Sequence, residues 1–352
     1  MAEPTPANDA SDSIMTVGTR QSPLALAQTD IVVSALQELF PDHSFPVRSM
    51  TTTGDRDQQT ALYDFGGKGL WTTQLEDKLV AGELDMVVHS LKDMPTSLPS
   101  GCVLGCISHR EDPRDTLVIK ASLAREEGWK TLADLPDGAI IGTSSVRRIA
   151  QLARRFPSLR FKDVRGNIQT RLRKLDEDPD MTALVLAAAG LQRMGLSDRI
   201  SQYLDKDSGG ILHAVGQGAL AIECRAGDER VLKALRRLAD EPTTLACLAE
   251  RSLMRTLEGG CSVPIGVETH WLEPGHLRFR AAVVSAPGTE AAEIELTETV
   301  TTASAAEQLG KRAAIDLVSR GADKILDAVN AARARPEGPP AATQALTEER
   351  LR

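Results

Sequence analysis

Residues 139–175 read AIIGTSSVRRIAQLARRFPSLRFKDVRGNIQTRLRKL, and this stretch contains the same local design twice. A short apolar run at 139–141 precedes a GTSS segment, and apolar residues then recur at helical spacing from Val146 onward. A second strand-like run at 159–164 precedes Asn167, a residue type that favours the N-cap of a helix. The pattern predicts two consecutive strand-then-helix units, which are the building blocks of an open α/β sheet.

Basic residues gather in the same stretch. Between Arg147 and Lys174 there are ten basic residues and one acid, Asp163, so this window carries +9 within a chain of net charge −8 and leaves −17 for the remainder. A chain this acidic does not attract nucleic acid or membranes by bulk charge. We therefore expect neither as a partner, and we expect a small, strongly anionic molecule to bind at the basic window.

The arginines stand at the predicted helix starts. Arg147 and Arg148 fall in the first helical turn, where a cation opposes the helix dipole at a cost of about 0.3–1 kcal/mol. Arg165 and Arg171 flank the second start in the same way. Because backbone amides at a helix N-terminus favour anions, an anionic ligand would remove the conflict.

A third junction of this kind lies near the N-terminus. The strand-like residues 14–17 run into GTRQSP, where Ser22 as N-cap and Pro23 at the first helical position predict a helix to about Phe40. Arg20 again stands at the entrance. A lone arginine is usually a solvated surface charge, but three coincident junctions favour an anion-binding site.

Bulk composition indicates an ordinary globular protein. The chain has 352 residues, 41% hydrophobic and 26% charged, and no apolar run approaches the roughly 20 residues of a membrane span. Residues 1–13 resemble neither a secretory signal nor a transit peptide, and five cysteines without zinc spacing suggest a reducing compartment. We expect a cytoplasmic protein with no disulfides and no metal. Four of the cysteines have apolar neighbours and are predicted to be small buried residues: Cys102, Cys106, Cys224 and Cys247.

The order of apolar patterns predicts the fold class. Strands alternate with helices to about residue 238, and polar segments at 109–115 and 212–218 are predicted to cross between two domains. Beyond 241 the pattern gives a helix to 257, strands at 277–284 and 293–300, and a helix over 304–332. We predict an α/β protein with two doubly wound, periplasmic-binding-protein-like domains joined by hinge crossings, plus a smaller α+β C-terminal domain. The predicted boundaries are 1–13 flexible tail, 14–110 and 216–239 domain 1, 111–215 domain 2, 240–333 domain 3 with a cysteine-bearing loop, and 334–352 disordered tail.

Asp93 is the candidate acid/base. It follows a predicted strand at 84–88 within HSLKDMP, beside Lys92 and before Pro95, which places the carboxylate on rigid scaffold. Capping of a turn before proline is the other interpretation of an isolated aspartate here. His89 is interpreted as structural, because no Gly-x-Ser-x-Gly nucleophile motif accompanies it.

Two glycine-rich loops carry further candidates. Cys261 lies within GGCSVPIG, where a bulky group could approach its sulfur, and the residues alone leave open a reactive thiol or a small buried side chain. Lys68 lies in GGKG, which lacks the spacing of a phosphate loop, and residues 55–67 could form a flap that delivers it.

Seven ordered motifs over residues 14–332 resemble the porphobilinogen deaminase (hydroxymethylbilane synthase) family: TRQSPLA at 19–25, GGKGLW at 66–71, HSLKDMP at 89–95, GTSSVRR at 142–148, VRGNIQTRL at 164–172, AVGQGALAIECR at 214–225 and GGCSVPIG at 259–266. The resemblance implies a monomer of three domains, with a dipyrromethane cofactor held by Cys261 through a thioether. Four porphobilinogen molecules are added in turn with release of ammonia, and water then frees the linear tetrapyrrole.

The resemblance also implies residue roles. Asp93 would accept pyrrole N–H hydrogen bonds, stabilise the cation left by ammonia loss, and move protons. Each porphobilinogen brings two carboxylates, and a like-charge pair at about 4 Å costs about 1 kcal/mol in water and about 4 at an effective dielectric of 20. Cations that clamp carboxylates are therefore required. The matching motif positions give the cofactor-binding and substrate-binding residues: Arg20, Ser22, Lys68, Lys92, Thr143, Ser144, Ser145, Arg147, Arg148, Arg165, Gly166, Asn167, Arg171, Arg193 and Gln217.

The sequence departs from the family pattern at Trp71, where phenylalanine is common, and at Asp64, where some members have a basic residue. Two other functions fit parts of the chain. A two-domain anion-binding receptor or sensing module would share the hinge-crossed lobes but needs neither the loop thiol nor Asp93. A thiol-dependent hydrolase would use Cys261 but lacks a convincing histidine partner.

Overall fold

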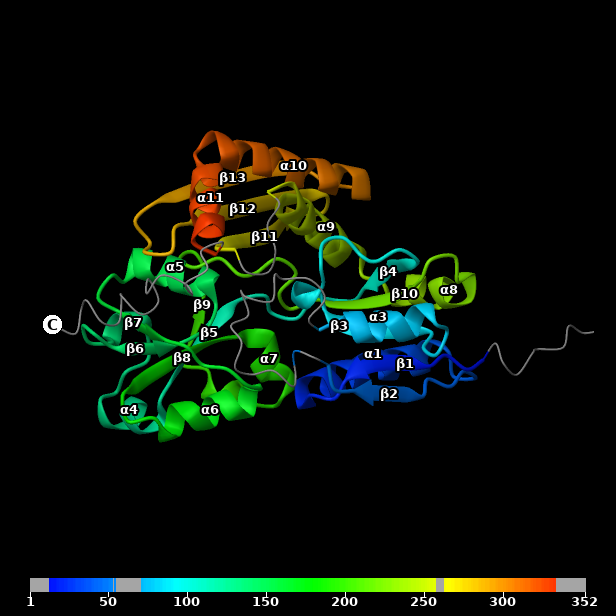
Figure 1. The fold of residues 1–352 in the computed structure, drawn as a ribbon, viewed down its shortest axis with the longest axis horizontal. Coiled ribbons are helices and arrows are strands. Elements are labelled where there is room, and N and C mark those ends of the chain that lie inside the picture. The colour runs from blue at the N-terminus through cyan, green and yellow to red at the C-terminus, as the bar shows by residue number, and fades with distance from the viewer. Residues whose placement is uncertain (1–12, 53, 55–70, 258–262, 334–352) are drawn as a thin grey trace, which may run out of the picture.

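The computed structural model describes residues 13–52, 54, 71–257 and 263–333. Three β-sheets organise these residues, two with five strands and one with three. Figure 1 shows the first sheet on the right, the second on the left and the third above them. Each sheet together with the helices packed on it is called the first, second or third unit below. The predicted fold class, two α/β domains followed by a smaller α+β part, is confirmed, and both five-stranded sheets are mixed.

The first unit has the strand order β2-β1-β3-β10-β4. β1 pairs in parallel with β2 and β3, whereas β10 runs antiparallel to both β3 and β4. Its strands are β1 (Val17–Arg20), β2 (Val47–Met50), β3 (Met86–Ser90), β4 (Cys102–Ile107) and β10 (Leu220–Arg225), and its helices are α1 (Pro23–Leu39), α3 (Thr73–Val80), α8 (Glu229–Leu238) and the short 3-10 helix η1 (Leu91–Asp93).

The second unit has the order β7-β6-β8-β5-β9. β6 is parallel to β7 and β8, and β5 is antiparallel to β8 and β9. Its strands are β5 (Asp115–Ile119), β6 (Ile140–Gly142), β7 (Arg160–Lys162), β8 (Met181–Ala187) and β9 (Gln202–Leu204). Its helices are α4 (Ala121–Glu126), α5 (Val146–Arg155), α6 (Ile168–Glu177), α7 (Ala188–Arg193) and the 3-10 helices η2 (Leu132–Asp134) and η3 (Ser197–Arg199).

The third unit is an antiparallel sheet in the order β11-β12-β13 with helices packed against it. Its elements are α9 (Glu241–Thr256), β11 (Ile265–Glu273), β12 (His276–Val284), β13 (Ala291–Thr299), α10 (Ala303–Ser319) and α11 (Ala322–Arg333). Its core is built around Phe279, which is fully buried among aliphatic side chains. No helix in the described part of the chain combines the length and the apolarity that crossing a bilayer requires.

The chain crosses between the first and second units twice, as the sequence predicts. The outgoing crossing, residues 108–114, joins β4 to β5, and the return crossing, residues 211–219, leads back to β10. They lie side by side, because the Glu111 amide donates to the Gly218 carbonyl at 3.2 Å. Gly218 adopts φ +88°, and a Cβ there would lie 2.4 Å from the Glu111 oxygen. This close backbone approach explains the glycine.

Several predicted strand boundaries are wrong. The first strand is not 14–17 but Val17–Arg20, and Ile14 forms only an isolated bridge with Ser44. Gly18, which interrupts the apolar pattern, is needed inside the strand, since a Cβ there would lie 2.5 Å from Leu84. β3 extends two residues beyond the predicted end, through His89 and Ser90.

In the third unit, the predicted single helix over 304–332 is two helices. Gly321 has φ +93° and separates α10 from α11, as glycine in this conformation commonly does at a helix C-terminus. β11 has no counterpart in the prediction, because its second half is polar and partly exposed.

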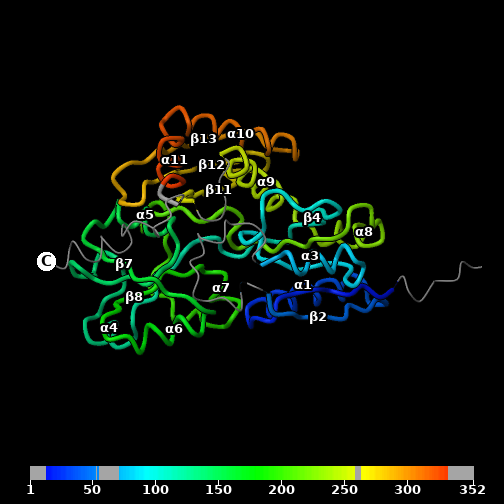
Figure 2. The backbone as a smooth tube through the Cα atoms, in the orientation of Figure 1, coloured from blue at the N-terminus to red at the C-terminus, as the bar shows by residue number. Residues whose placement is uncertain are grey.

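Figure 2, which traces the backbone alone, shows the same three groups of segments, with the third unit above the level of both crossings. β11 contacts the return crossing directly: Val267 donates its amide to the His213 carbonyl at 2.8 Å. Gly266 also packs closely there, since a Cβ would lie 2.6 Å from Gln151 Nε2 and 2.9 Å from Leu212. The third unit is therefore in contact with both the crossing and helix α5.

Candidate active site

Strand-to-helix corners position the predicted site residues. β6, β7 and β8 are parallel neighbours, so the residues that follow their carboxyl ends lie along one edge of the second sheet. In the first unit β1 and β3 are also parallel; Arg20 is the last residue of β1, and the η1 turn follows β3. The sequence correctly places the basic residues at these corners.

Asp93 lies on a short, well-anchored turn. η1 follows β3 directly, and the neighbours Leu91 and Met94 are fully buried. The Leu91 amide donates to the Ala219 carbonyl at 3.0 Å, which ties the turn to the return crossing. The side chains of Lys92 and Asp93 are partly exposed. The carboxylate is thus held on rigid scaffold, as the sequence indicates.

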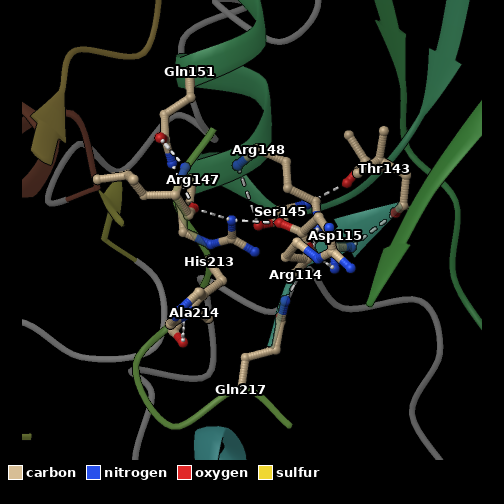
Figure 3. A network of polar contacts seen from close by, with 12 residues as sticks. Arg114, Asp115, Thr143, Ser145, Arg147, Arg148, Gln151, His213, Ala214 and Gln217 are labelled. Atoms are coloured by element: carbon tan, nitrogen blue, oxygen red, sulfur yellow. Dashed lines mark hydrogen bonds and ion pairs between the residues drawn. The ribbon is translucent and has the colours of Figure 1, made fainter. Parts of the chain in front are cut away.

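Arg147 and Arg148 are buried rather than solvated. Their side chains, 6% and 8% exposed, both pair with the fully buried Asp115: Arg147 Nη1 lies 2.6 Å from Oδ2, and Arg148 Nη2 lies 2.7 Å from Oδ1 (Figure 3). Arg147 also donates to the Leu212 carbonyl at 2.7 Å, and Arg148 to the Val185 carbonyl at 2.8 Å. Burial alone would raise the pKa of Asp115, but the two guanidinium groups and their hydrogen bonds hold it far below its usual range.

The hydroxyl groups of the GTSS segment build the corner itself. Ser145 caps α5 by accepting from the Arg148 amide at 3.4 Å, and Thr143 Oγ1 accepts from the Ser145 amide at 3.2 Å. Ser144 Oγ donates to the Val164 carbonyl at 2.9 Å and so links this corner to the next one. These contacts order the turn that presents the two arginines.

The corner after β7 follows the same logic. Asn167 caps α6 by accepting from the Thr170 amide at 2.8 Å, which confirms the predicted N-cap. Arg171 Nε donates to the Gly166 carbonyl at 2.7 Å, and Arg165 Nε lies 3.1 Å from Asp163. Both arginines are partly exposed, in contrast to the buried pair on α5.

Arg193 contacts the return crossing, and Gln217 is part of it. Arg193, at the end of α7, donates to the Gly218 carbonyl at 2.7 Å. Gln217 Nε2 donates to Asp115 Oδ1 at 2.9 Å and to the Pro113 carbonyl at 2.7 Å (Figure 3). The sequence reasoning names both residues but does not anticipate that Gln217 joins the two crossings or that Arg193 binds the return crossing.

At the first corner Ser22 caps α1, accepting from the Ala25 amide at 3.3 Å, as predicted. The guanidinium of Arg20 lies over the indole of Trp71 at 4.0 Å from the ring centroid. The departure at Trp71 therefore provides a cation–π partner for a predicted ligand-binding arginine.

Electrostatic effects show which of these groups lie near one another. Burial lowers the pKa of Lys92 to about 8, where Asp93 and Asp115 raise it while Arg148 and Arg147 lower it. Burial likewise lowers the pKa of Arg171 to about 10, assisted by Arg148 and opposed by Asp163 and Asp93. The first unit's Lys92 and Asp93 thus interact with the second unit's arginines. These cations are destabilised where they stand, so the site fits an anionic cofactor and substrate.

Sequence reasoning missed three polar residues whose side chains are largely buried near the crossings. Asp115 is one; the others are Arg110, on the outgoing crossing, and Glu250, on α9, which pair at 2.7 Å. Glu250 also accepts from the Gly216 amide at 2.8 Å, and Arg110 Nε donates to the Gln217 carbonyl at 2.8 Å. For Asp115 a signal existed, since a charged residue opens the fully buried strand DTLVI.

Two predicted site residues, Cys261 and Lys68, lie outside the described residues, as do Asp64 and the proposed flap at 55–67. The four other cysteines are buried, as predicted, and burial raises the thiol pKa to about 12 for Cys102, Cys106 and Cys247 and to about 11 for Cys224. They are thus poor nucleophiles.

His89 pairs with another buried residue. Its Nε2 lies 3.0 Å from Glu223 Oε2 on the neighbouring strand β10. Both side chains are almost completely buried, which agrees with a structural role for His89. A cavity of about 600 Å³ lies elsewhere, at the other end of α5, and none of its lining residues is a predicted site residue.

Fold and site together define a two-lobed α/β protein with a cationic, carboxylate-bearing junction between its lobes. Residues 15–233 match the family model "Porphobilinogen deaminase, dipyromethane cofactor binding domain", and residues 244–319 match "Porphobilinogen deaminase, C-terminal domain". The chain belongs to the porphobilinogen deaminase family. It is therefore a transferase of tetrapyrrole biosynthesis whose cofactor is dipyrromethane.

Curated relatives agree with this placement. Porphobilinogen deaminase of Neurospora crassa is 54% identical over 90% of this chain and 94% of the relative, and that of Yarrowia lipolytica is 54% identical over 89% and 93%. Among solved structures, the methionine-binding protein MetQ matches 68% of this chain and 94% of its own with 10% identity and a TM-score of 0.39. The family membership rules out a receptor or sensing module without catalysis as the main function.

Proposed function

We propose that this protein condenses four porphobilinogen molecules, one after another, onto a dipyrromethane bound through Cys261, and that water then releases linear hydroxymethylbilane. The observation that carries the proposal is that the η1 turn, with Lys92 and Asp93, is bonded to the return crossing through the Ala219 carbonyl. In the same crossing Gln217 bonds Asp115, the partner of Arg147 and Arg148. A carboxylate beside several cations is what a reaction needs when its substrate is polyanionic and its transition state is cationic.

Asp93 is the proposed catalytic residue. Its carboxylate accepts the pyrrole N–H of the substrate and stabilises the positive charge that develops as ammonia leaves. The same carboxylate takes the proton released when the new carbon–carbon bond has formed. When bound, dipyrromethane supplies the acceptor carbon for the first addition. Because Asp93 stands on a turn fixed by buried neighbours, it can serve each addition from one position.

The cations divide the binding of carboxylates. Arg171, Arg165 and Lys92 are partly exposed and are proposed to meet the acetate and propionate groups directly. Arg147 and Arg148 join them from the first turn of α5. The proposed set of cofactor-binding and substrate-binding residues is completed by Arg20, Ser22, Lys68, Thr143, Ser144, Ser145, Gly166, Asn167, Arg193 and Gln217. The hydroxyls and Asn167 act mainly through the turns that they cap.

Attachment of the cofactor at Cys261 is supported by the position of the residues that follow it. Gly266, five positions further along, packs against Gln151 and Leu212, and the Leu212 carbonyl is the acceptor of Arg147. The segment leaving the cysteine loop thus reaches the arginine-bearing helix. We also propose the domain boundaries given above, a cytoplasmic location and a monomeric state.

Intact mass spectrometry tests the proposal. The purified protein is expected to be heavier than its sequence by two pyrrole units, and Cys261→Ser should remove the added mass. Cys247→Ser, which changes a buried thiol, is the matched control and should retain it. Active protein with the mass of the bare polypeptide would refute the covalent attachment.

A further inference from the structure

Asp115 joins both crossings to the arginine-bearing helix. It ends the outgoing crossing and begins β5, and its carboxylate is fully buried. Arg147 and Arg148 donate to it from the first turn of α5, and Gln217 donates to it from the return crossing at 2.9 Å (Figure 3). One carboxylate therefore holds together three segments that lie far apart in the sequence.

Among the residues that the structure describes, the charges at this point do not balance. Two guanidinium groups share one carboxylate, and their other acceptors in this part of the chain are the neutral carbonyls of Leu212 and Val185. Burial lowers the pKa of Arg147, Asp115 raises it, and the neighbouring Arg148 lowers it again. Asp115 thus supplies the negative charge that allows both arginines to be buried, and a net positive charge remains for a ligand.

We propose that Asp115 is a positioning residue that acts as the resident counter-ion of Arg147 and Arg148, and that ligand carboxylates take these guanidinium groups over from Asp115 as the bound chain lengthens. The proposal rests on the proposed function, since it takes Arg147 and Arg148 to bind substrate carboxylates. Each added unit brings two carboxylates, so competition for the two guanidinium groups grows with every addition.

Exchange of counter-ions has a consequence for the crossings. A buried carboxylate that loses an arginine is left without a partner, which is strongly unfavourable unless water reaches it. Water can reach Asp115 when the crossings separate, and separation breaks the contacts of Gln217 with Asp115 and Pro113 and of Glu111 with Gly218. The crossings therefore loosen in step with the number of bound units. This makes room between the two lobes as the product grows.

Hydrogen–deuterium exchange on the holoenzyme tests the proposal. Covalent intermediates with increasing numbers of porphobilinogen units are separated by charge, and amide exchange is followed in segments 108–119 and 211–219. The Glu111 amide, which donates to the Gly218 carbonyl, should exchange about tenfold faster in the most heavily loaded species than in the unloaded one. This factor is expected when the crossings lose the hydrogen bond that Gln217 donates to the charged Asp115. Val300, whose amide is bonded to Gly275 in the third unit, should not change.

The variant Asp115→Asn keeps the side-chain shape and removes the charge. Its crossings should exchange rapidly at every loading, and, because the resident competitor is gone, KM for porphobilinogen should fall while kcat also falls. A merely structural role would raise KM or leave it unchanged. The matched control is Asp178→Asn, which also removes one negative charge from the second unit, at the ion pair with Lys162. In this variant, amide exchange in the crossings should depend on the number of bound units as it does in the wild-type protein.

Failure of the two proposals can be told apart. If the wild-type protein forms no covalent intermediates, the proposed function is wrong. If it forms them and the crossings exchange at the same rate at every loading, only the role of Asp115 is wrong. Should Asp115→Asn not fold, Gln217→Leu removes one contact of Asp115 and leaves both arginines in place. Its crossings should also exchange rapidly without dependence on loading, and a retained wild-type dependence would overturn the proposal.

Discussion

The first and second units present similar strand-to-helix corners to the site, yet they contribute different chemistry. The first unit supplies Asp93, a carboxylate on a 3-10 turn, with Lys92 beside it. The second supplies guanidinium groups, two of them buried and paired with Asp115. The comparison teaches that rate and binding should be separable by mutation. Changes in the first unit's carboxylate should alter turnover, whereas changes in the second unit's cations should alter affinity, cofactor loading and stability.

The largest expected effect is that of Asp93→Asn. The substituted side chain keeps its shape but can neither take a proton nor stabilise the cation, so kcat should fall by about 10²–10⁴ while KM changes little. Ammonia release gives the rate, and intact mass shows whether the cofactor is still attached. Asp77→Asn, an exposed aspartate on α3 of the same unit, is the control and should remain fully active. Near-normal ammonia release from Asp93→Asn would contradict the proposal that the first unit supplies the catalytic carboxylate and the second unit the binding cations.

How far this division can be predicted from sequence differs between the two units. The caps Ser22, Ser145 and Asn167 are local signals, because each side chain bonds an amide three residues ahead, and these helix starts are predicted correctly. The placement of Arg147 and Arg148 in the first turn follows from the same signal. What a local signal cannot supply is the partner of each arginine.

The partners come from distant parts of the chain. Asp115 lies 32 residues before Arg147 in the sequence and reaches it only because β5 joins the second sheet antiparallel to β8. The Arg110–Glu250 pair spans 140 residues. Pairings of this kind depend on strand order and on the two crossings, which hydrophobic periodicity does not encode. The same limit applies to β11, whose polar half is recognisable as a strand only beside β12.

The second prediction concerns the buried cations. Arg148→Leu removes the hydrogen bonds that Arg148 donates to the buried Asp115, while Arg147 still pairs with this carboxylate, so the free energy of unfolding should fall by about 1.5–3 kcal/mol. The fraction of protein carrying cofactor should fall as well. Arg154→Leu on the same helix is the matched control: Arg154 is 44% exposed and lies 3.4 Å from Glu293, so its loss should cost less than about 1 kcal/mol. Urea unfolding and intact mass measure both. Equal losses for the two variants would show that burial does not distinguish these arginines.

A third prediction uses the pKa of Lys92 in the first unit. Its value is lowered from 10.5 to about 8, so between these pH values the unfolded chain binds more protons at this residue than the folded chain does. The contribution of Lys92 to stability is therefore unfavourable below pH 8 and becomes less so as the pH rises to 10.5. Relative to Lys92→Met, the wild-type protein without substrate should gain stability over this range, by less than about 3 kcal/mol because the side chain is partly exposed.

Unfolding at pH 7.5 and pH 10 for both proteins measures the Lys92 effect, and the difference between them removes the contribution of other groups that titrate. Affinity for substrate should change in the opposite direction, since the cation that binds carboxylates is lost above pH 8. A constant difference in stability across the range would mean that Lys92 is solvated. In that case the first unit would contribute a carboxylate without an associated desolvated cation.

The smallest expected effect tests whether the first unit also takes part in binding, through Arg20. This arginine has an aromatic partner at its corner, Trp71 at 4.0 Å, where the buried arginines of the second unit have a carboxylate. A cation–π contact near the surface is worth about 0.5–1 kcal/mol, so Trp71→Leu should raise KM for porphobilinogen by about two- to fivefold and leave kcat unchanged. Trp71→Phe retains an aromatic face and should restore most of the affinity. If the leucine and phenylalanine variants have the same KM, the ring does not position Arg20, and the binding of carboxylates belongs to the second unit and Lys92.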